Sequence, residues 1–510
     1  RQLKEPIRGN DMRYPLFNTV IDQLADEVHA LSGTGKIDAG RRVAGSAVLK
    51  LRVSVSKLVS DTVSIRFSFK AKAQASIHLG KDHYKSTRYQ QALSYRIHVK
   101  RAFDGMLSLG YLRIDKRGFH GEVGKSYLTR YSATPKLLSL FQGVDPRICP
   151  VIIPTAAYDE TVRVQIKDTI QKDGKPFDVK RLVDYQDNKQ TNLMRTNLVE
   201  INRCLESHWF DLNLDDESID QVQKEMLSKK QRKAGVERQI NFAKRTLYRV
   251  FNDPEFKTGG RFYGGWWQEI PKQYRHSILI DGKQTVEFDY SNLHPTFLYL
   301  QEGLKLQDDA YEGIVGYTAK NKNAPEVIDR RTAKVVLNAM LNARKPLSRS
   351  PRGFKKYGCK CTWQEMTKAV EERHKPIAHY FHTNVGLKLQ LLDSQIAERV
   401  ILKFVLKGYP VLPLHDSFLL HHGLKQSLQD AMAEAFEEVI GGTVGIDQKT
   451  QKPLKFNDPD WGLFWQQQFN EEEQEHANND RITDDMAGLL KSIDVGHFIR
   501  QDAFWTLMQG

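Results

Sequence analysis

The chain has 510 residues and a formal net charge of +14, from 76 lysines and arginines against 62 aspartates and glutamates. A hydrophobic fraction of 40% is typical of a folded globular protein and excludes a disordered or fibrous chain. The length exceeds what one hydrophobic core supports, so we expect roughly two to four domains. The excess of positive charge favours a polyanionic partner, nucleic acid first, over a basic protein that is merely soluble.

The cysteine content and the hydropathy pattern restrict the compartment. Four cysteines are too few and too unevenly spaced for a disulfide framework, which indicates a reducing environment. Cys359 and Cys361 lack a second Cys or His pair at zinc-site spacing, so we interpret them as ordinary thiols, with a structural zinc as the less favoured alternative. No apolar run is long enough for a membrane helix, and the first residues hold no apolar signal core. We therefore expect a cytoplasmic protein without a membrane partner.

Residues 1–150 are predicted to form an N-terminal α+β domain. Alternating apolar residues over 48–70 predict half-buried strands. Helical spacing follows over 88–110, and 111–134 indicate two strands around a glycine-rich turn, before a short helix at 135–141. A helix followed by a basic hairpin resembles a winged-helix DNA-binding module. The residues suited to phosphate contact are Lys85, Arg88, Tyr89, Arg96, Lys100, Arg101, Arg113, Lys116 and Arg117. A solvated face on an ordinary α+β domain is the alternative.

Residues 151–258 are predicted to connect this domain to the rest of the chain. The polar stretch 150–190 has few periodic apolar positions and is typical of a strand-and-loop connection. A helix then places four apolar residues on one face, namely Leu198, Ile201, Leu205 and Trp209. A basic helix is expected next, carrying Lys229, Lys230, Arg232, Lys233, Arg238, Lys244 and Arg245. At the other end, the acidic composition of 466–510 predicts a flexible linker and a last docking helix.

Three segments between these regions point to chemistry. They are VEFDYSNLHPTFLY (286–299), DRRTAKVVLNAMLNA (329–343) and YPVLPLHDSFLL (409–420). In the first, a strand leads directly into Asp289 and a helix follows Pro295. In the third, His415 and Asp416 lie at the turn between a buried strand and a returning strand. Each aspartate taken alone is more simply a turn or surface residue.

Two carboxylates from strands of one sheet can hold two Mg²⁺ ions roughly 4 Å apart, with Mn²⁺ as a substitute. One ion lowers the pKa of an attacking hydroxyl group, and the other neutralises a triphosphate and its leaving group. The middle segment favours this interpretation. On a helix, Arg330, Lys334, Asn338 and Asn342 recur every four residues and share one stripe. Two cations one turn apart suit nucleotide phosphates, whereas a solvated basic helix is the alternative.

In this order, Asp289-Tyr290-Ser291, Arg330-x-x-x-Lys334 and His415-Asp416 resemble motifs A, B and C of the DNA polymerase I family, also called family A. The related single-subunit phage-type RNA polymerases share this arrangement of motifs. The similarity covers about residues 250–425 and implies a right-hand fold, with the palm and fingers at 259–465 and a thumb in 151–258. The positions that match the metal ligands are Asp289, Asp416 and the backbone carbonyl of Tyr290. The resemblance further implies triphosphate binding by Arg330 and Lys334 and primer binding by His415.

Two neighbouring segments extend the resemblance. The stretch GGRFYGGWWQEIPKQYR (259–275) is similar to the family's arginine-containing loop, which implies that Arg261 and Gln268 contact the primer–template minor groove. The alternative is a glycine-rich turn that packs its two tryptophans into a core. A long amphipathic helix is predicted over 387–408, and Gln395 is our choice for the family's template-contacting glutamine.

Several positions depart from the family pattern. Asn338 and Asn342 stand where family A has an aromatic residue and a tyrosine, so nucleotide stacking and template contact must differ. His294 stands where those enzymes keep a glutamate against the ribose 2′-hydroxyl, which leaves sugar selectivity open. Ser417 after Asp416 resembles the RNA polymerases, whereas the motif B spacing and the upstream loop favour DNA synthesis.

The sequence thus predicts a template-directed DNA polymerase that uses a DNA primer–template and deoxynucleoside triphosphates. No acidic clusters of a proofreading exonuclease are visible. By fold-level analogy, a compact polymerase with a DNA-binding head suggests a replication protein of a phage, plasmid or other mobile element. Two alternatives remain: a single-subunit RNA polymerase or primase that uses ribonucleotides, and a non-catalytic DNA-binding initiator that keeps the polymerase shape.

Overall fold

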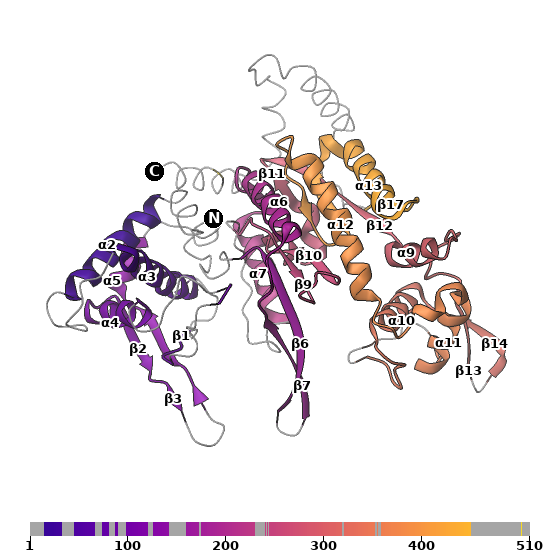
Figure 1. The fold of residues 1–510 in the computed structure, drawn as a ribbon, viewed down its shortest axis with the longest axis horizontal. Coiled ribbons are helices and arrows are strands. Elements are labelled where there is room, and N and C mark those ends of the chain that lie inside the picture. The colour runs from indigo at the N-terminus through magenta and orange to yellow at the C-terminus, as the bar shows by residue number, and fades with distance from the viewer. Residues whose placement is uncertain are drawn as a thin grey trace, which may run out of the picture.

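The computed structural model describes residues 15–32, 45–66, 74–80, 87–89, 98–120, 126–141, 160–172, 175–229, 240, 242, 244–318, 321–351, 354, 357, 359–449 and 501. The predicted linker and docking helix of 466–510 lie outside these residues, apart from Gln501. Figure 1 shows the N-terminal helices (indigo) at one end of the long axis and the orange helices of residues 330–373 at the other. Helices and sheets are mixed throughout, in agreement with the expected α+β composition.

The N-terminal part packs three helices against a small antiparallel sheet. The helices are α2 (Pro15–Ser32), α3 (Gly45–Arg66) and α4 (Lys100–Ser108). The sheet has the strand order β1-β5-β2, with β1 (Ala75–Ile77), β2 (Leu112–Lys116) and β5 (Thr129–Ala133). Its apolar side chains form a cluster separate from the rest of the chain, including Leu24, Val28, Leu51, Val59, Phe103 and Tyr131. This part therefore has a core of its own.

The strands predicted within 48–70 are wrong, because residues 45–66 form helix α3. The helix is buried on most of its circumference, so the alternating apolar residues 51, 53 and 55 are all inside. Hydroxyl residues of the helix are buried as well and bond within it: Ser54 donates to the Lys50 carbonyl and Thr62 to the Leu58 carbonyl. A helix buried all round has no polar face, and its periodicity is then easily mistaken for that of a strand.

The predicted hairpin and short helix after it are confirmed. Strands β2 and β5 pair antiparallel, and β3 (Phe119–His120) and β4 (Ser126–Tyr127) pair nearer the tip. The short helix is α5 (Pro135–Leu138), followed by the 3-10 turn η4 (Ser139–Phe141). Of the helix expected over 88–110, α4 forms from Lys100, and residues 90–97 lie outside the described chain.

A second sheet begins the central part, with the order β10-β9-β6-β7. Its strands are β6 (Val162–Lys172), β7 (Lys175–Leu182), β9 (Tyr248–Phe251) and β10 (Gly259–Tyr263). The long β6–β7 hairpin confirms the expected strand-and-loop connection. Helix α6 (Lys189–Glu206) confirms the predicted apolar face for Leu198, Ile201 and Leu205, which are all buried. Trp209 is also buried but lies beyond the end of the helix, so its predicted place on that face is wrong. The Asn188 side chain caps its first turn by accepting a hydrogen bond from the Thr191 backbone N–H. In return, the Thr191 hydroxyl oxygen accepts a hydrogen bond from the Asn188 backbone N–H.

The basic helix expected over 229–245 is wrong in its second half. Helix α7 (Asp216–Lys229) ends where the basic run starts, and residues 230–239 lie outside the described chain. Lys244 and Arg245 lie in an irregular segment before β9. Arg245 is fully buried and donates to the carbonyl of His208, so its side chain does not lie on a basic surface open to a nucleic acid.

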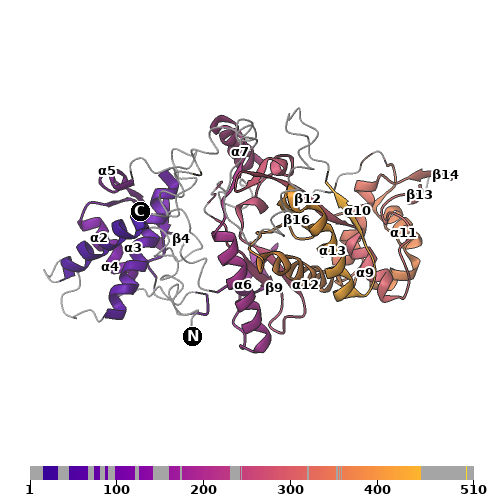
Figure 2. The same cartoon turned by 90° about the horizontal axis from the view of Figure 1, so that it is seen from above.

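The third sheet has the order β15-β16-β12-β11-β8, and β17 pairs with β12. Its strands are β8 (Phe210–Leu212), β11 (Ile278–Ile280), β12 (Lys283–Ser291), β15 (Leu412–Pro413), β16 (Ser417–His421) and β17 (Gly445–Gln448). Three helices accompany it: α9 (Leu293–Gln301), α12 (Gly386–Val405) and α13 (Lys425–Ile440). Helices α12 and α13 pack side by side near β12 and β16 (Figure 2). The predicted strand into Asp289, the helix after it, the β-turn at Asp416 and the long helix over 387–408 are all confirmed.

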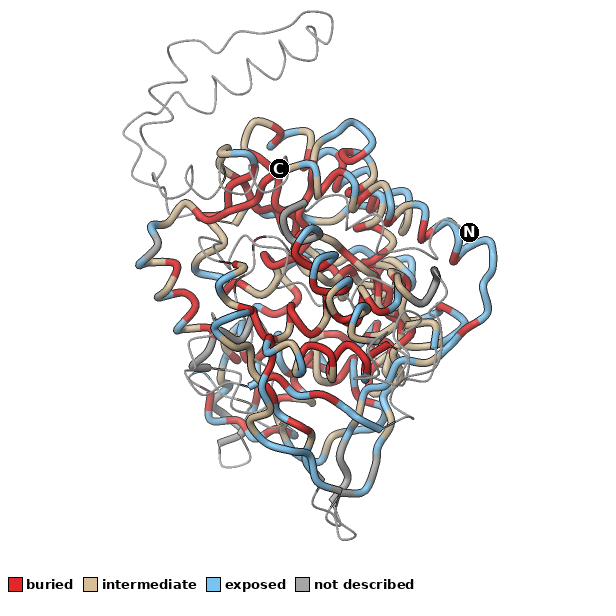
Figure 3. Tube along the Cα trace, turned by 90° about the vertical axis from the view of Figure 1, so that its left-hand side faces the viewer, coloured by how far each residue is buried: buried red, intermediate tan, exposed pale blue. Residues whose placement is uncertain are grey.

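The last part carries helices α10 (Arg330–Asn342) and α11 (Trp363–Arg373) and the hairpin of β13 (Val315–Thr318) and β14 (Asn321–Val327). It shares one apolar core with the two larger sheets, and buried segments (red in Figure 3) run through the interior with exposed ones around them. Among the described residues, no helix is long and apolar enough to cross a membrane.

Candidate functional site

The two predicted carboxylates lie next to each other at one end of the third sheet. Asp289 stands opposite Ser417 in the antiparallel register of β12 and β16, and Asp416 directly precedes Ser417. The backbone N–H of Tyr290 donates to the carbonyl oxygen of Asp416 at 3.4 Å. Neighbouring strands lie roughly 4.8 Å apart. Two aspartates far apart in the sequence are therefore neighbours in space.

A tight turn places Asp416 at the tip of its hairpin. The Leu414 N–H donates to the Ser417 carbonyl at 2.7 Å, and His415 has a φ of 74°, in the left-handed region that side chains other than glycine rarely adopt. Burial, and then the positive charge of Arg261, lowers the pKa of His415, so its imidazole is neutral near pH 7. Its ring packs edge-on against Tyr263 at 5.3 Å. Within the described chain its Nδ1 is buried without a hydrogen-bond partner.

Asp289 is a largely buried carboxylate with charges of both signs close to it. Burial and the neighbouring charge of Asp416 raise its pKa, and the ammonium groups of Lys449 and Lys334 act in the opposite direction. Lys449, just after β17, forms an ion pair with Asp289. The Asp289 side chain is 20% exposed, so the pair is only partly screened by water.

Helix α10 brings one of its cations near these carboxylates and pairs the other with Asp309. Lys334 lies close enough to Asp289 to lower the pKa of that carboxyl group. Arg330, one turn earlier, donates to Asp309 at 2.7 Å. Arg330 and Lys334 both lie over the buried Tyr311 ring, at 5.4 and 5.5 Å. Arg330 and Lys334 therefore lie on one face of α10, as predicted. Arg330 is already paired with Asp309.

The two asparagines on this stripe lie further from the carboxylates. Asn338 is half-buried, and its carbonyl accepts from Asn342 Nδ2 at 2.8 Å. Asn342 packs against Gly386 at the start of α12, where an added Cβ would lie 2.2 Å from the Asn342 amide oxygen. Asn342 therefore sits where helices α10 and α12 meet.

A buried aspartate from α12 gathers two more predicted residues. Arg261 on β10 forms an ion pair with Asp393, with its Nε donating at 3.0 Å, and His294 Nε2 lies 3.2 Å from the same carboxylate. Asp393 is 1% exposed, so the carboxylate depends on these partners. Burial acts to lower the pKa of Arg261, but the charges of Asp393 and then Asp416 outweigh it and raise this pKa, which places the group beside the carboxylate pair.

Gln268 is used to hold the hairpin that carries Asp416. Its Nε2 donates to the carbonyls of Phe262 and Pro413, and its Oε1 accepts from the Gly264 N–H. Trp267 Nε1 also donates to Pro413, and both tryptophans of the loop are buried. The loop therefore packs as the glycine-rich turn of our alternative interpretation. The minor-groove contact of Gln268 stays a prediction. Its side-chain amide already bonds three backbone groups of the protein.

Gln395 is not the residue of α12 that reaches this group. It is half-exposed, and its carbonyl accepts from Arg399 at 3.3 Å. Residues two apart on a helix point roughly 200° apart, so Gln395 and Asp393 lie on different faces. The template contact of Gln395 stays a prediction.

Sequence reasoning missed Lys449, Asp393, Asp309 and Tyr311. Lys449 follows the last strand in a run of polar residues, and nothing in that run distinguishes it. Asp393 had one available signal, because an aspartate there falls on the face of the predicted amphipathic helix that carries Leu389, Ile396 and Val400. No known protein-family model matches this chain, and no curated protein is significantly similar to it.

Proposed function

We propose that this protein is a template-directed DNA polymerase that uses Asp289 and Asp416 to bind two Mg²⁺ ions. The observation that carries the proposal is the adjacency of Asp289, on β12, and Asp416, in the turn before β16, with Lys334 of α10 near Asp289. The four segments that resemble family A motifs come together around this pair. Under this proposal the third sheet is the palm, α10 and its surroundings are the fingers, and the helices of 151–258 form the thumb.

The donor set fits Mg²⁺. Carboxylate and carbonyl oxygens are the ligands that this ion prefers, and they would be supplied by Asp289, Asp416 and the Tyr290 backbone carbonyl. The raised pKa of Asp289 supports an added cation there, and the Lys449 ammonium occupies such a position. When bound, the ions would activate a primer 3′-hydroxyl and neutralise the triphosphate.

The remaining side chains bind and orient. Lys334 would neutralise a phosphate beside Asp289, and Arg330 would do so after exchanging Asp309 for the nucleotide. The Arg261–Asp393–His294 group would fix the floor of the nucleotide site through buried, charge-assisted bonds. A neutral His415 could donate or accept a hydrogen bond at the primer end without adding charge.

The N-terminal part supports a DNA-binding head. Its order of elements and its β1-β5-β2 sheet agree with a winged helix. The hairpin exposes Arg113, Lys116, Arg117 and Phe119, and Lys116 lies over the Tyr127 ring at 4.3 Å. Not every predicted phosphate contact fits.

Two arginines of the predicted set are already engaged or buried. Arg88 donates to Asp184 and Asp187, and Arg101 is buried. Lys85 and Arg96 lie outside the described residues. The head therefore offers the hairpin, rather than these arginines, to nucleic acid.

The ion pair of Lys449 with Asp289 favours a second candidate, the non-catalytic initiator. A lysine that neutralises the first metal ligand permanently would leave a polymerase fold that binds DNA without extending it. The two candidates differ in whether Mg²⁺ displaces this lysine.

Extension of a labelled primer–template with Mg²⁺ and either dNTPs or rNTPs tests the proposal. We expect template-dependent dNTP extension that falls by roughly a thousandfold or more in Asp289→Ala/Asp416→Ala. Asp430→Ala, which removes an exposed carboxylate from α13, is the matched control and should extend normally. Preference for rNTPs without a primer would identify an RNA polymerase or primase, and intact DNA binding without extension would identify the initiator.

A further inference from the structure

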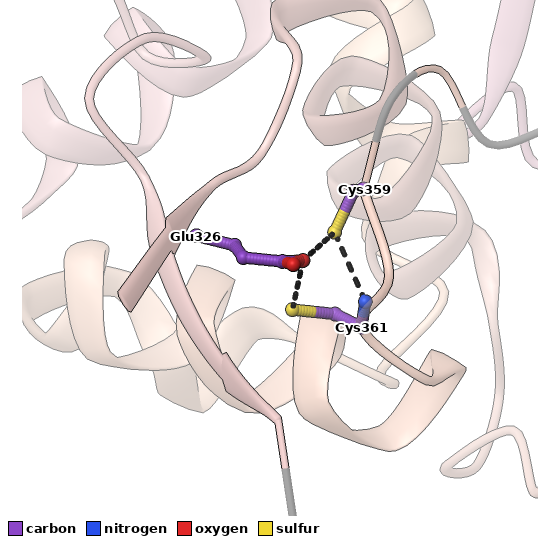
Figure 4. A group of neighbouring side chains, drawn as sticks. All are labelled: Glu326, Cys359 and Cys361. Atoms are coloured by element: carbon purple, nitrogen blue, oxygen red, sulfur yellow. Dashed lines mark hydrogen bonds between the residues drawn. The ribbon is translucent and has the colours of Figure 1, made fainter. Parts of the chain in front are cut away.

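Glu326, Cys359 and Cys361 converge at a point that the polymerase site does not use (Figure 4). Glu326 comes from strand β14, and the two cysteines lie just before helix α11. Their ligand atoms all lie within 4.8 Å of one another. Both cysteines are buried, and neither is in a disulfide.

The spacing of these atoms is that of a tetrahedral metal site. The Sγ atoms of Cys359 and Cys361 lie 3.8 and 3.9 Å from the same oxygen, Glu326 Oε2. Around a tetrahedral zinc ion, with bonds of roughly 2.0 to 2.3 Å, neighbouring ligand atoms are about 3.5 to 3.8 Å apart. A shift of a few tenths of an ångström would therefore suffice to close the group around an ion.

The backbone around the two cysteines leaves space for the sulfur atoms and donates hydrogen bonds to the ligand atoms. Gly316 on β13 lies opposite Glu326, and a Cβ added there would be 2.7 Å from Cys361 Sγ. The Lys360 N–H donates to Glu326 Oε2 at 2.8 Å, and the Cys361 N–H donates to Cys359 Sγ at 3.3 Å. The cysteines lie directly before α11, whose N-cap is Thr362.

The chemistry of the ligands selects the ion. Thiolates are soft ligands that exclude Mg²⁺ and Ca²⁺, and two thiolates with one carboxylate suit zinc. Three protein ligands leave one tetrahedral position for water or a further ligand. An ion here would join the β13–β14 hairpin to α11, and Glu326 lies only four residues before Arg330.

We propose that Glu326, Cys359 and Cys361 bind a structural zinc ion that fastens the β13–β14 hairpin to helix α11. This proposal takes up the alternative of a structural zinc that was weighed against ordinary thiols from the sequence. The missing second pair of ligands is supplied in part by a glutamate from a distant strand, which the spacing of cysteines alone does not reveal.

The test is metal binding by the full, tag-free chain kept reduced. After incubation with Zn²⁺ and gel filtration, we expect about one zinc ion per chain by elemental analysis. Substitution of Co²⁺ should give the strong near-ultraviolet absorption of thiolate-to-cobalt charge transfer. Cys359→Ser/Cys361→Ser should abolish both signals, while Cys204→Ser, which alters a buried cysteine of α6, should keep them.

Glu326→Gln separates the carboxylate from the thiols. We expect it to retain the thiolate band and to weaken zinc affinity by roughly tenfold or more. Asp289→Ala/Asp416→Ala should bind zinc normally, so this result is independent of the polymerase proposal. If the cysteine variant fails to fold, the melting temperature of the wild-type chain provides the test. It should be higher in the presence of zinc than in the presence of a chelator.

Three results would overturn the inference. They are equal zinc content in the wild type and the folded double cysteine variant, a cobalt spectrum without a thiolate band, and no effect of zinc on the wild-type melting temperature.

Discussion

Two clusters of charge in this protein have opposite electrostatics. In the first, between β6 and α6, Arg195 bonds Glu160 at 3.0 Å and also pairs with Asp187, and Arg88 binds Asp184 at 2.7 Å. In the second, Asp289 and Asp416 lie side by side on adjacent strands. In the first cluster two arginines pair with three carboxylates, so every carboxylate has a cationic partner. The second cluster places two carboxylates side by side, and Lys449 pairs with Asp289.

The direction of the carboxyl pKa separates the two clusters. A hydrogen bond from Arg88 lowers the pKa of Asp184, so this aspartate stabilises the fold in its charged form. Burial and Asp416 raise the pKa of Asp289, so its charged form destabilises the fold. The first cluster pairs opposite charges, whereas the second brings two like charges together in a largely buried position, an arrangement that is typical of functional sites.

Breaking the first cluster should have the largest effect on stability. Arg195→Met leaves Glu160, which is 8% exposed, without its main partner. We expect the free energy of unfolding to fall by about 3 to 5 kcal/mol, measured by urea titration. Arg203→Met, which removes an exposed pair with Glu200 on the same helix, should change it by less than about 1 kcal/mol. Equal losses in the two variants would contradict a buried network.

Lys334→Ala should leave the fold intact and reduce nucleotide incorporation. Because Lys334 is an exposed cation beside Asp289, its removal takes away charge that a triphosphate would meet. We expect the single-turnover rate to fall by roughly a hundredfold. Lys368→Ala, at an exposed lysine of α11, is the control. A normal rate in Lys334→Ala would remove α10 from the site.

Asp289→Asn should stabilise the protein while abolishing its activity. The folded pKa of Asp289 lies above its ordinary value of 3.8, so ionisation opposes folding as pH rises through that interval. We expect a gain of about 1 kcal/mol in unfolding free energy near pH 7, which disappears below about pH 4, where both states are protonated. Asp184→Asn should behave oppositely, losing stability near pH 7 and matching the wild type only in acid. Destabilisation by both changes would show that the clusters do not differ.

Lys449→Met should have the smallest effect, on the Mg²⁺ concentration that extension requires. This variant bears on the choice between polymerase and initiator. If Mg²⁺ displaces the Lys449 ammonium from Asp289, removing that charge should lower the Mg²⁺ concentration for half-maximal extension by about threefold to tenfold. Lys449→Arg retains the charge and should resemble the wild type. A higher Mg²⁺ requirement in Lys449→Met would mean that the lysine assists the reaction, and extension that appears only in Lys449→Met would identify it as a block.

The sequence predicted local structure well where a short apolar run ends at turn-forming residues or apolar residues recur at helical spacing. The strand into Asp289, the turn at Asp416 and the helix over 330–342 follow from short-range patterns of apolar residues and turn formers. Helix α3 was predicted as strands because it is buried on most sides, and the basic run was extended too far because Arg245 is buried rather than exposed. In both cases tertiary burial, which a local pattern does not contain, decided the outcome.

The sequence by itself determined which residues could form a two-carboxylate site, because strand ends and helical stripes follow from spacing of a few residues. Only the tertiary structure decided their partners. Lys449 reaches Asp289 because β17 pairs with β12, Asp393 collects Arg261 and His294 because α12 crosses β10, and Glu326 meets the two cysteines across the β13–α11 contact. Such contacts depend on how distant elements pack, and charge pairing and metal ligation act through space at a few ångströms, whatever the separation along the chain.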